Sequence, residues 1–178
     1  MIYVFLTNGT EEIEALATVD FLRRCDIAVK TVGISDQFVC GSHNINIACD
    51  ASARQISVED NVDGIVIPGG MPGTLNLEKS KIVSDFIDYS AKNDKIIAAI
   101  CAAPSILGHK GLLKGKKATC FPGFEKELEG ATVLTDRAVV DGNIITGKGM
   151  GAAIEFAHAI ATKLVGKEKA DKVKESLQ

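Results

Sequence analysis

The sequence predicts an α/β protein in which helices cover both faces of a mostly parallel sheet. Short apolar segments typical of buried strands alternate along the 178 residues with longer segments of helical periodicity. The apolar run over residues 95–100 shows no polar alternation, as expected of a strand buried on both faces of a parallel sheet. Glycine-rich loops over 69–73 and 147–151 follow predicted strands. In such folds the ligand site lies beyond the carboxyl ends of the strands.

The first part of the chain is predicted to be a β-α-β unit. A strand over 2–6 precedes a helix over 11–24, and a second strand covers 28–33. Thr10 is a suitable N-cap because its side chain can accept a hydrogen bond from a first-turn N–H. Four apolar residues of this helix have the spacing of a core-facing stripe: Ile13, Leu16, Ala17 and Phe21.

The middle of the chain carries the central strands. Alternation over 44–47 predicts a half-exposed antiparallel excursion, and residues 63–68 form the next buried strand. An amphipathic helix over 80–91 leads to the apolar run described above. That run turns directly into a helix over 104–110, where Pro104 suits the first turn because its missing N–H has no role there.

The last part of the chain alternates short strands with two helices. A hairpin turn is expected at 141–143, where the sequence is Asp-Gly-Asn. The strands are predicted over 117–120, 132–134, 138–140 and 144–146, and the helices over 152–165 and 167–176. Because the chain has no repeat, linker or low-complexity stretch, we expect a single domain over 1–178.

Composition and charge argue against several functional classes. A net charge of −3 offers no basic surface for nucleic acid, and residues 1–6 lack the basic lead and the length of a signal or membrane segment. The five cysteines are odd in number and show no CxxC spacing, which argues against a disulfide framework and a structural zinc site. They indicate a reducing cytoplasm. These cysteines are Cys25, Cys40, Cys49, Cys101 and Cys120.

Cys101 lies where the central strand turns into a helix, which is the arrangement of a nucleophile elbow. The free N–H groups there favour a thiolate over a thiol and an oxyanion on a bound substrate. From this stretch alone, a small buried hydrophobic side chain is an equal alternative. Gly69 and Gly70 follow the neighbouring strand, so we favour backbone N–H groups brought close to a ligand over a simple tight turn.

Glu14 lies one turn into the first predicted helix, close to the end of the first strand. An ionised Glu14 beside Cys101 would oppose thiolate formation, whereas a protonated one would donate to the sulfur and lower the thiol pKa. A solvated helix residue is the third alternative. The sequence leaves all three open.

Neither a cofactor nor a metal is indicated by the remaining patterns. The glycines of 147–151 lack the final G-x-x-G element and follow a hairpin, so they do not indicate a nicotinamide site. The histidines are scattered, give no metal-ligand pattern and place no imidazole obviously within reach of the Cys101 sulfur. They are His43, His109 and His158.

Four segments together resemble the ThiJ/PfpI superfamily, and within it the branch of the parkinsonism-associated protein deglycase and its bacterial homologues. They are NGTEEIE at 8–14, VIPGG at 66–70, AAICAAP at 98–104, and GMG at 149–151 before EFA at 155–157. The resemblance covers essentially the whole chain. It implies a flavodoxin-like three-layer α/β/α sandwich, a homodimer and no cofactor.

The resemblance also implies roles for individual residues. Cys101 would be the reactive cysteine, Glu14 its protonated partner, and the backbone N–H groups of Gly70 and Ala102 the anion pocket. The rim of this pocket or the dimer contact would include Arg24, His43, Phe121 and Met150.

Two departures from the family patterns narrow the expected activity. Peptidase and amidotransferase relatives carry a His directly after the cysteine, where this chain has Ala102, which argues against proteolysis. Some members of the deglycase branch have a His at the position of Phe121. A general-base step must therefore use Glu14, the thiolate itself or water.

The resemblance implies cysteine-dependent, cofactor-free conversion of reactive dicarbonyls, such as methylglyoxal and glyoxal, to hydroxy acids. Repair of early glycation adducts would be related chemistry. The alternative is a non-enzymatic oxidative-stress sensor or redox-regulated chaperone that acts through a Cys101 sulfinate. A third hypothesis, a flavodoxin-type ligand-binding module, is weakened because no phosphate-cradling loop follows the first strand.

Overall fold

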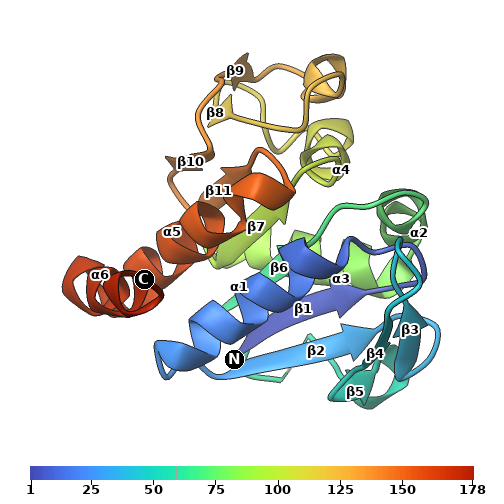
Figure 1. The fold of residues 1–178 in the computed structure, drawn as a ribbon. Helices are drawn as coiled ribbons and strands as arrows, with labels where there is room; N and C mark the ends of the chain where they lie inside the picture. Colours follow the sequence, from blue (N-terminus) through green and yellow to red (C-terminus); the bar gives the residue numbers. More distant parts are fainter. Residues whose placement is uncertain (59) are drawn as a thin grey trace.

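The computed structural model describes residues 1–58 and 60–178, and within them a seven-stranded sheet forms the centre of the molecule (Figure 1). All its strands are parallel except β10, which pairs antiparallel with β11. The order is β10 (Ala138–Asp141), β11 (Ile144–Gly147), β7 (Ile96–Ile100), β6 (Gly64–Ile67), β1 (Ile2–Leu6), β2 (Val29–Gly33) and β5 (Ala51–Ser52). Two small pairs stand apart: β3 (Phe38–Cys40) with β4 (Asn46–Ala48), and β8 (Lys117–Ala118) with β9 (Thr132–Val133).

Helices cover both faces of this sheet (Figure 1). On one face α1 (Glu12–Arg24) lies beside α5 (Ala153–Val165), and α6 (Lys167–Ser176) packs against α5. The other face carries α2 (Gly73–Glu78), α3 (Lys81–Lys92) and α4 (Pro104–His109). Short 3-10 turns are η1 (Ala53–Gln55), η2 (Glu125–Glu127) and η3 (Met150–Ala152). The predicted α/β/α sandwich with a mostly parallel sheet is therefore confirmed.

Alternate strand residues build two apolar cores, one on each face of the sheet. Leu6 of β1 packs with Leu22 of α1 and Phe156 of α5. Its neighbour Phe5 points the other way and meets the ring of Phe86 edge-on, with centroids 5.1 Å apart. Burial on both faces explains why the central strands read as unbroken apolar runs.

Helix α1 begins differently from the prediction. Its N-cap is Glu11, whose Oε2 accepts a hydrogen bond from the Glu14 N–H at 2.6 Å. The predicted cap, Thr10, instead accepts from the N–H of Thr7 at 3.0 Å and closes the loop after β1. The prediction of Thr10 was wrong because a carboxylate one residue later can reach the same first-turn N–H.

The face that α1 buries also differs from the prediction. Phe21 is buried as expected and Ala17 is half-buried, but Ile13 is 50% exposed and Leu16 is 40% exposed. Placing Ile13 and Leu16 in the core was wrong because the sheet-facing stripe includes a polar residue, Glu14, that hydrophobic spacing does not count. The stripe comprises Glu14, Ala15, Thr18, Val19 and Leu22.

The region between β2 and β7 is more structured than expected. The β3–β4 hairpin is the antiparallel excursion that the alternation over 44–47 indicated. Helix α2 was not predicted, because a helix that begins at Gly73 directly after Pro72 has little intrinsic propensity in its first turn.

In the described parts of the chain, no helix has the length and apolarity to cross a lipid bilayer.

Candidate functional site

Four loops meet where β1, β6, β7 and β11 end. From β1 the chain passes through α1 to β2 on one side of the sheet, whereas from β6 it passes through α2 and α3 to β7 on the other. A sheet whose connections diverge in this way has a crevice at the point of divergence. The start of α1, the loop after β6 and the residues after β7 surround that point.

Cys101 follows β7 in a left-handed backbone conformation, with φ of +65°. This conformation is costly for a residue other than Gly, Asn or Asp, and such strain concentrates at functional sites. Two hydrogen bonds of 2.9 Å hold it: the Cys101 N–H donates to the carbonyl of Gly147, and its carbonyl accepts from the N–H of Phe121. Pro104 then opens α4, so the strand-to-helix elbow has the predicted geometry and leaves the Cys101 side chain partly exposed.

Glu14 projects from the first turn of α1 and is completely buried. Its Oε2 accepts the N–H of Gly69 at 2.9 Å, while its Oε1 is buried with no hydrogen-bond partner within residues 1–58 and 60–178. Burial raises the pKa of Glu14 to about 7, against the lowering effect of the Cys101 side chain and the N–H groups of Gly69 and Met150. A solvated role is therefore excluded, and the carboxyl keeps its proton up to near-neutral pH.

Gly69 is the spacer that lets these two side chains meet. A Cβ atom there would lie 2.7 Å from the Cys101 Cβ and 2.8 Å from the Glu14 Oε2, closer than real Cβ contacts allow. On the other side of the sulfur, the N–H groups of Gly70 and Ala102 lower the Cys101 pKa by hydrogen bonding. The candidate site thus combines a thiol, a buried carboxyl and two backbone donors.

The ionisation of Cys101 depends on where Glu14 holds its proton. Burial, together with the charge and hydrogen bonding of an ionised Glu14, raises the pKa of the thiol to about 12. When Glu14 is protonated, the repulsion from its charge disappears and its hydroxyl can donate to the sulfur, so the hydrogen bond then favours the thiolate, against the effect of burial. Thiol and carboxyl therefore titrate as a coupled pair.

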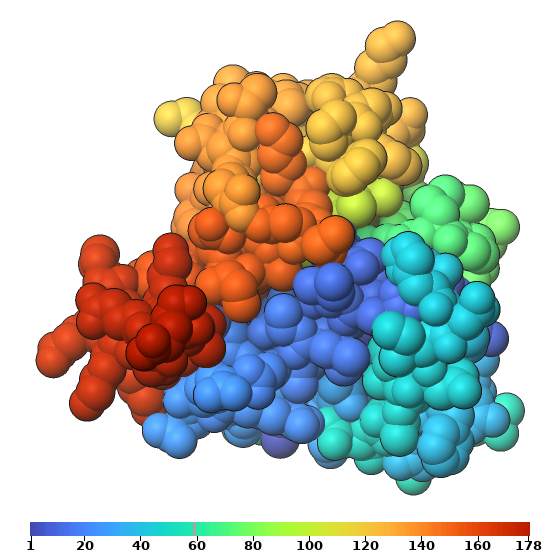
Figure 2. All heavy atoms as spheres, viewed as in Figure 1, coloured from blue at the N-terminus to red at the C-terminus, as the bar shows by residue number. Residues whose placement is uncertain are grey.

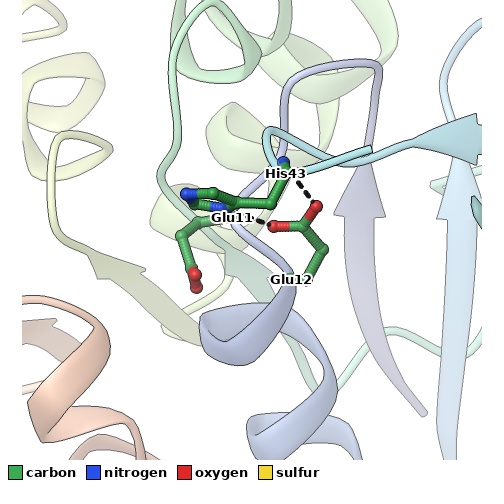
Figure 3. A group of neighbouring side chains, drawn as sticks. All are labelled: Glu11, Glu12 and His43. Atoms are coloured by element: carbon green, nitrogen blue, oxygen red, sulfur yellow. Dashed lines mark hydrogen bonds and ion pairs between the residues drawn. The ribbon is translucent and has the colours of Figure 1, made fainter. Parts of the chain in front are cut away.

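A second buried carboxylate, Glu12, faces the β3–β4 hairpin (Figure 3). Its oxygens accept from the N–H of His43 at 2.7 Å and the hydroxyl of Ser42 at 3.2 Å, and the His43 Nδ1 lies at 3.0 Å. Burial alone would raise the pKa of Glu12, but hydrogen bonds from the His43 ring and from the backbone N–H groups of His43, Glu12 and Ile45 lower it to about 2. A Cβ at Gly41 would lie 2.2 Å from Glu12 Oε1, so the loop approaches too closely for any side chain there. Figure 2 shows this cyan hairpin lying against the blue start of α1.

Glu11, Glu12 and His43 place possible metal-ligand atoms within 4.8 Å of one another. In Figure 3 the Glu11 carboxylate points away from the other two side chains. Its Oε2 caps α1, and both oxygens of Glu12 already accept hydrogen bonds. The group therefore fits a tie between helix and hairpin better than a metal site.

Comparison with known proteins settles the family. The model of the DJ-1/PfpI family matches residues 1–163. This chain belongs to the DJ-1/PfpI family. Protein dj-1beta of Drosophila melanogaster is 38% identical over 177 residues, which cover 98% of this chain and 94% of that protein. The crystal structure of Drosophila melanogaster DJ-1beta, at 37% identity, matches with a TM-score of 0.93 over 99% of this chain and 96% of that one.

A further family member carries an activity in its name. The glutathione-independent glyoxalase DJR-1.2 of Caenorhabditis elegans is 33% identical over 164 residues, which cover 91% of this chain and 87% of that protein.

The residues expected at the pocket rim from the family resemblance lie in three places. Phe121 and Met150 line a cavity of about 260 Å³ next to the Cys101 elbow. His43 lies on the hairpin, beyond Glu12. Arg24 lies at the other end of α1, where it pairs with Asp20 at 2.6 Å and lines a separate cavity of about 570 Å³ against α6. Within this chain, Arg24 is therefore not part of the Cys101 site.

The role of Glu12 was missed by the sequence analysis, which assigned this residue no role of its own. The signal was the doubled acid Glu11-Glu12, since one carboxylate suffices for the cap. The other two histidines are engaged elsewhere: His109 bridges Glu78 at 2.5 Å and Glu127 at 2.8 Å, and His158 pairs with Asp171 at 2.7 Å.

Proposed function

We propose that this protein converts 1,2-dicarbonyl aldehydes such as methylglyoxal and glyoxal to 2-hydroxy acids without an added cofactor. The observation that carries this proposal is the fully buried Glu14, whose unpartnered Oε1 and raised pKa make it a proton donor to the neighbouring Cys101. A carboxyl tuned to near neutrality suits proton transfer in both directions. The name of the Caenorhabditis elegans relative, a glutathione-independent glyoxalase, supports the same reaction class.

In the proposed reaction the Cys101 thiolate attacks the aldehyde carbon and forms a C–S bond. The carbonyl electron pair moves onto oxygen, where the N–H groups of Gly70 and Ala102 stabilise the charge. Glu14 protonates this oxygen, and its carboxylate then removes the proton from the same carbon and delivers it to the adjacent one. The hydroxyl proton on the first carbon passes to the oxygen of the neighbouring carbon, so the first carbon is oxidised to a thioester while its neighbour is reduced to an alcohol.

Water then hydrolyses the thioester, which releases the 2-hydroxy acid and restores the thiol. The net change is the addition of water, so neither an external oxidant nor a reductant is needed. Early glycation adducts on protein side chains present the same carbon, and their repair would be related chemistry at this site.

Lactate formation from methylglyoxal in the absence of glutathione tests the proposal. We expect Cys101→Ser to abolish turnover, and Cys40→Ser, which alters the other partly exposed cysteine, to retain it. Equal rates for wild type and Cys101→Ser would contradict the proposal.

Partial exposure favours a second candidate function, an oxidation sensor. Cys101 is partly exposed, whereas Cys25, Cys49 and Cys120 are buried, so peroxide reaches Cys101 more readily than these three thiols. A sulfinate at Cys101 would find hydrogen-bond donors in the two backbone N–H groups and in protonated Glu14. Peptide mass spectrometry after mild peroxide should show oxygen added to Cys101 first, and earlier modification of any other cysteine would contradict this role.

We also propose a homodimer in the cytoplasm, where a reducing environment suits five free cysteines. The exposed Ile13 and Leu16 give α1 an apolar outer face that a second copy could cover. Sedimentation should report twice the chain mass of 18.8 kDa, and Ile13→Asp should shift the protein toward monomer. A wild-type monomer at micromolar concentration would contradict the dimer.

A further inference from the structure

A cavity of about 260 Å³ lies between the loop after β8 and η3, and one of its lining residues, Phe121, is hydrogen-bonded through its backbone to Cys101. Its apolar wall is formed by Phe121, Pro122, Met150 and Ala152. Phe121 is 47% exposed and Met150 is 50% exposed, so two large apolar side chains border an open hollow. Exposed apolar surface around a concave feature is typical of a ligand subsite.

Hydrogen bonds fix both walls of this cavity to the candidate catalytic pair. The N–H of Phe121 donates to the carbonyl of Cys101 at 2.9 Å. The N–H of Cys101 donates to the carbonyl of Gly147 at 2.9 Å, and Gly147 leads directly into the opposite wall at Lys148 and Gly149. The Phe121 ring also lies over this opposite wall, since a Cβ at Gly149 would be 3.1 Å from its Cδ2. Both walls of the cavity are therefore held by the backbone of Cys101.

The charges around the cavity argue against a positively charged occupant. Arg137 lines it, but its guanidinium is paired with Glu155 at 2.8 Å and also donates to the carbonyl of Gly151. Lys148 lines it too, with its ammonium 3.3 Å from the carbonyl of Thr135 and no carboxylate within ion-pair distance in the described residues. No acidic residue is part of the lining as the described residues define it. A neutral apolar group fits this combination best.

We propose that this cavity is the subsite for the substituent on the dicarbonyl unit, and that Phe121 and Met150 make the enzyme prefer bulky neutral substituents to hydrogen or methyl. This inference rests on the proposed function and names its substrate class: α-oxoaldehydes with aryl or branched alkyl groups. An apolar cavity of about 150 Å³ can hold benzene, so 260 Å³ is ample for one ring. Added apolar groups in such a pocket typically improve kcat/KM about tenfold or more.

Alkylation of Cys101 tests the subsite without any turnover. The thiolate displaces iodide from iodoacetamide or from N-benzyl iodoacetamide, and peptide mass spectrometry gives the rate at Cys101 for each. The preference is the rate with N-benzyl iodoacetamide divided by the rate with iodoacetamide. This ratio should be about tenfold higher for Cys101 in the wild type than for free cysteine. Phe121→Ser and Met150→Ser should lower this preference toward that of free cysteine, while Phe121→Leu should retain most of it.

Phe38→Ser is the matched control, because Phe38 is an exposed phenylalanine on β3, outside this cavity. It should leave the preference unchanged. Because the preference is the ratio of the two rates in the same variant, a change in the reactivity of the thiol cancels, so that loss of the benzyl preference reports the cavity alone. A wild-type preference equal to that of free cysteine would overturn the subsite.

Turnover separates the two proposals. The ratio of kcat/KM for 4-methyl-2-oxopentanal over methylglyoxal should exceed about ten in wild type and fall in Phe121→Ser. If Cys101 keeps its benzyl preference but no dicarbonyl is consumed, the proposed function fails and the subsite stands. If dicarbonyls are consumed with no preference for the larger one, the subsite fails and the proposed function stands.

Discussion

Two buried glutamates in the first turn of α1 behave in opposite ways. Burial raises the pKa of Glu14 to about 7, whereas hydrogen bonds outweigh burial at Glu12 and lower its pKa to about 2. Glu12 accepts from the His43 backbone, the Ser42 hydroxyl and the His43 ring. Glu14 accepts from the Gly69 N–H, and its other oxygen has no hydrogen-bond partner among the residues that the structure describes.

Both side chains are nearly inaccessible to solvent, so the difference lies in the number of hydrogen-bond donors and in depth, since Glu14 lies much farther from the protein surface than Glu12. A carboxylate surrounded by donors is held ionised and serves as a structural tie. A carboxyl with few donors retains a proton that it can give away, which is the pattern of an acid or base in catalysis. The two environments shift the two carboxyl pKa values in opposite directions. They therefore make Glu12 a structural tie and Glu14 the candidate acid or base.

The largest effect is expected on catalysis. Glu14→Gln keeps the shape and a donor but cannot transfer a proton, so dicarbonyl turnover should fall about 100-fold or more. Glu14→Leu should also raise the thiol pKa, because it removes the donor to the thiolate, as absorbance of the thiolate against pH would show. Glu12→Gln is the matched control and should keep turnover within tenfold of wild type. Comparable losses in Glu12→Gln and Glu14→Gln would remove the distinction between the two residues.

The second effect is the dependence of stability on pH between 4.5 and 7. Between pH 4.5 and 7 the folded state holds the Glu14 proton that the unfolded chain releases, so stability falls as pH rises through this window. The loss is about 3 kcal/mol, from the shift of the pKa to about 7. The free energy of unfolding in urea, measured at pH 5 and at pH 8, should show this loss in wild type and not in Glu14→Gln. Parallel curves for the two proteins would show that the Glu14 pKa is not raised.

The ionised Glu12 should make stability depend on pH in the acid range, below the range in which Glu14 acts. Glu12 is ionised in the folded state down to about pH 2, so its contribution is complete above pH 4.5 and is lost as pH falls toward 2. Glu12→Gln should cost about 2 kcal/mol at pH 7, since the hydrogen bonds to a buried charge are weakened. The free energy of unfolding of this variant should also change less between pH 4.5 and pH 2 than that of wild type. A variant as stable as wild type at pH 7 would refute the tie.

The smallest effect is expected at His43. Glu12 raises the pKa of His43 by hydrogen bonding and by its charge. The stabilisation of the charged pair is therefore present below pH 6.5 and is lost as pH rises through the raised pKa. His43→Ala removes only the ring and leaves the His43 N–H to Glu12 bond, so it should destabilise less than Glu12→Gln. Measuring it in the Glu14→Gln background separates it from the titration of Glu14.

Hydrophobic periodicity located most of the strands and helices, but it could not orient α1. Counting apolar residues selected the stripe with Ile13 and Leu16, since Glu14 counts as polar. A buried carboxyl in the sheet-facing stripe can be recognised only once the loop after β6 is known to bring the Gly69 N–H beside it. For the same reason the sequence left the protonation of Glu14 open.

Contacts between segments distant in sequence could not be predicted from the sequence for a similar reason. The elbow at Cys101 is local, so the adjoining strand, Pro104 and helix predicted it. The tie between Glu12 and His43 joins residues 31 positions apart and depends on how the hairpin folds back over α1. The resemblance assigned Arg24 to the pocket rim or the dimer contact, and only the fold shows that, ten positions after Glu14 on α1, it lies away from the Cys101 site of its own chain.

Gly69 gives the site an unusual sensitivity to sequence change. The contact between thiol and carboxyl exists because an atom is missing between them, so adding one methyl group there would wedge the pair apart without altering either partner. An alanine scan would identify Cys101 and Glu14 as essential. It would detect the importance of position 69 only if glycines were also substituted. In natural variation a single-base change from a glycine to an alanine codon suffices. The smallest possible gain of volume would then be among the most harmful changes in the chain.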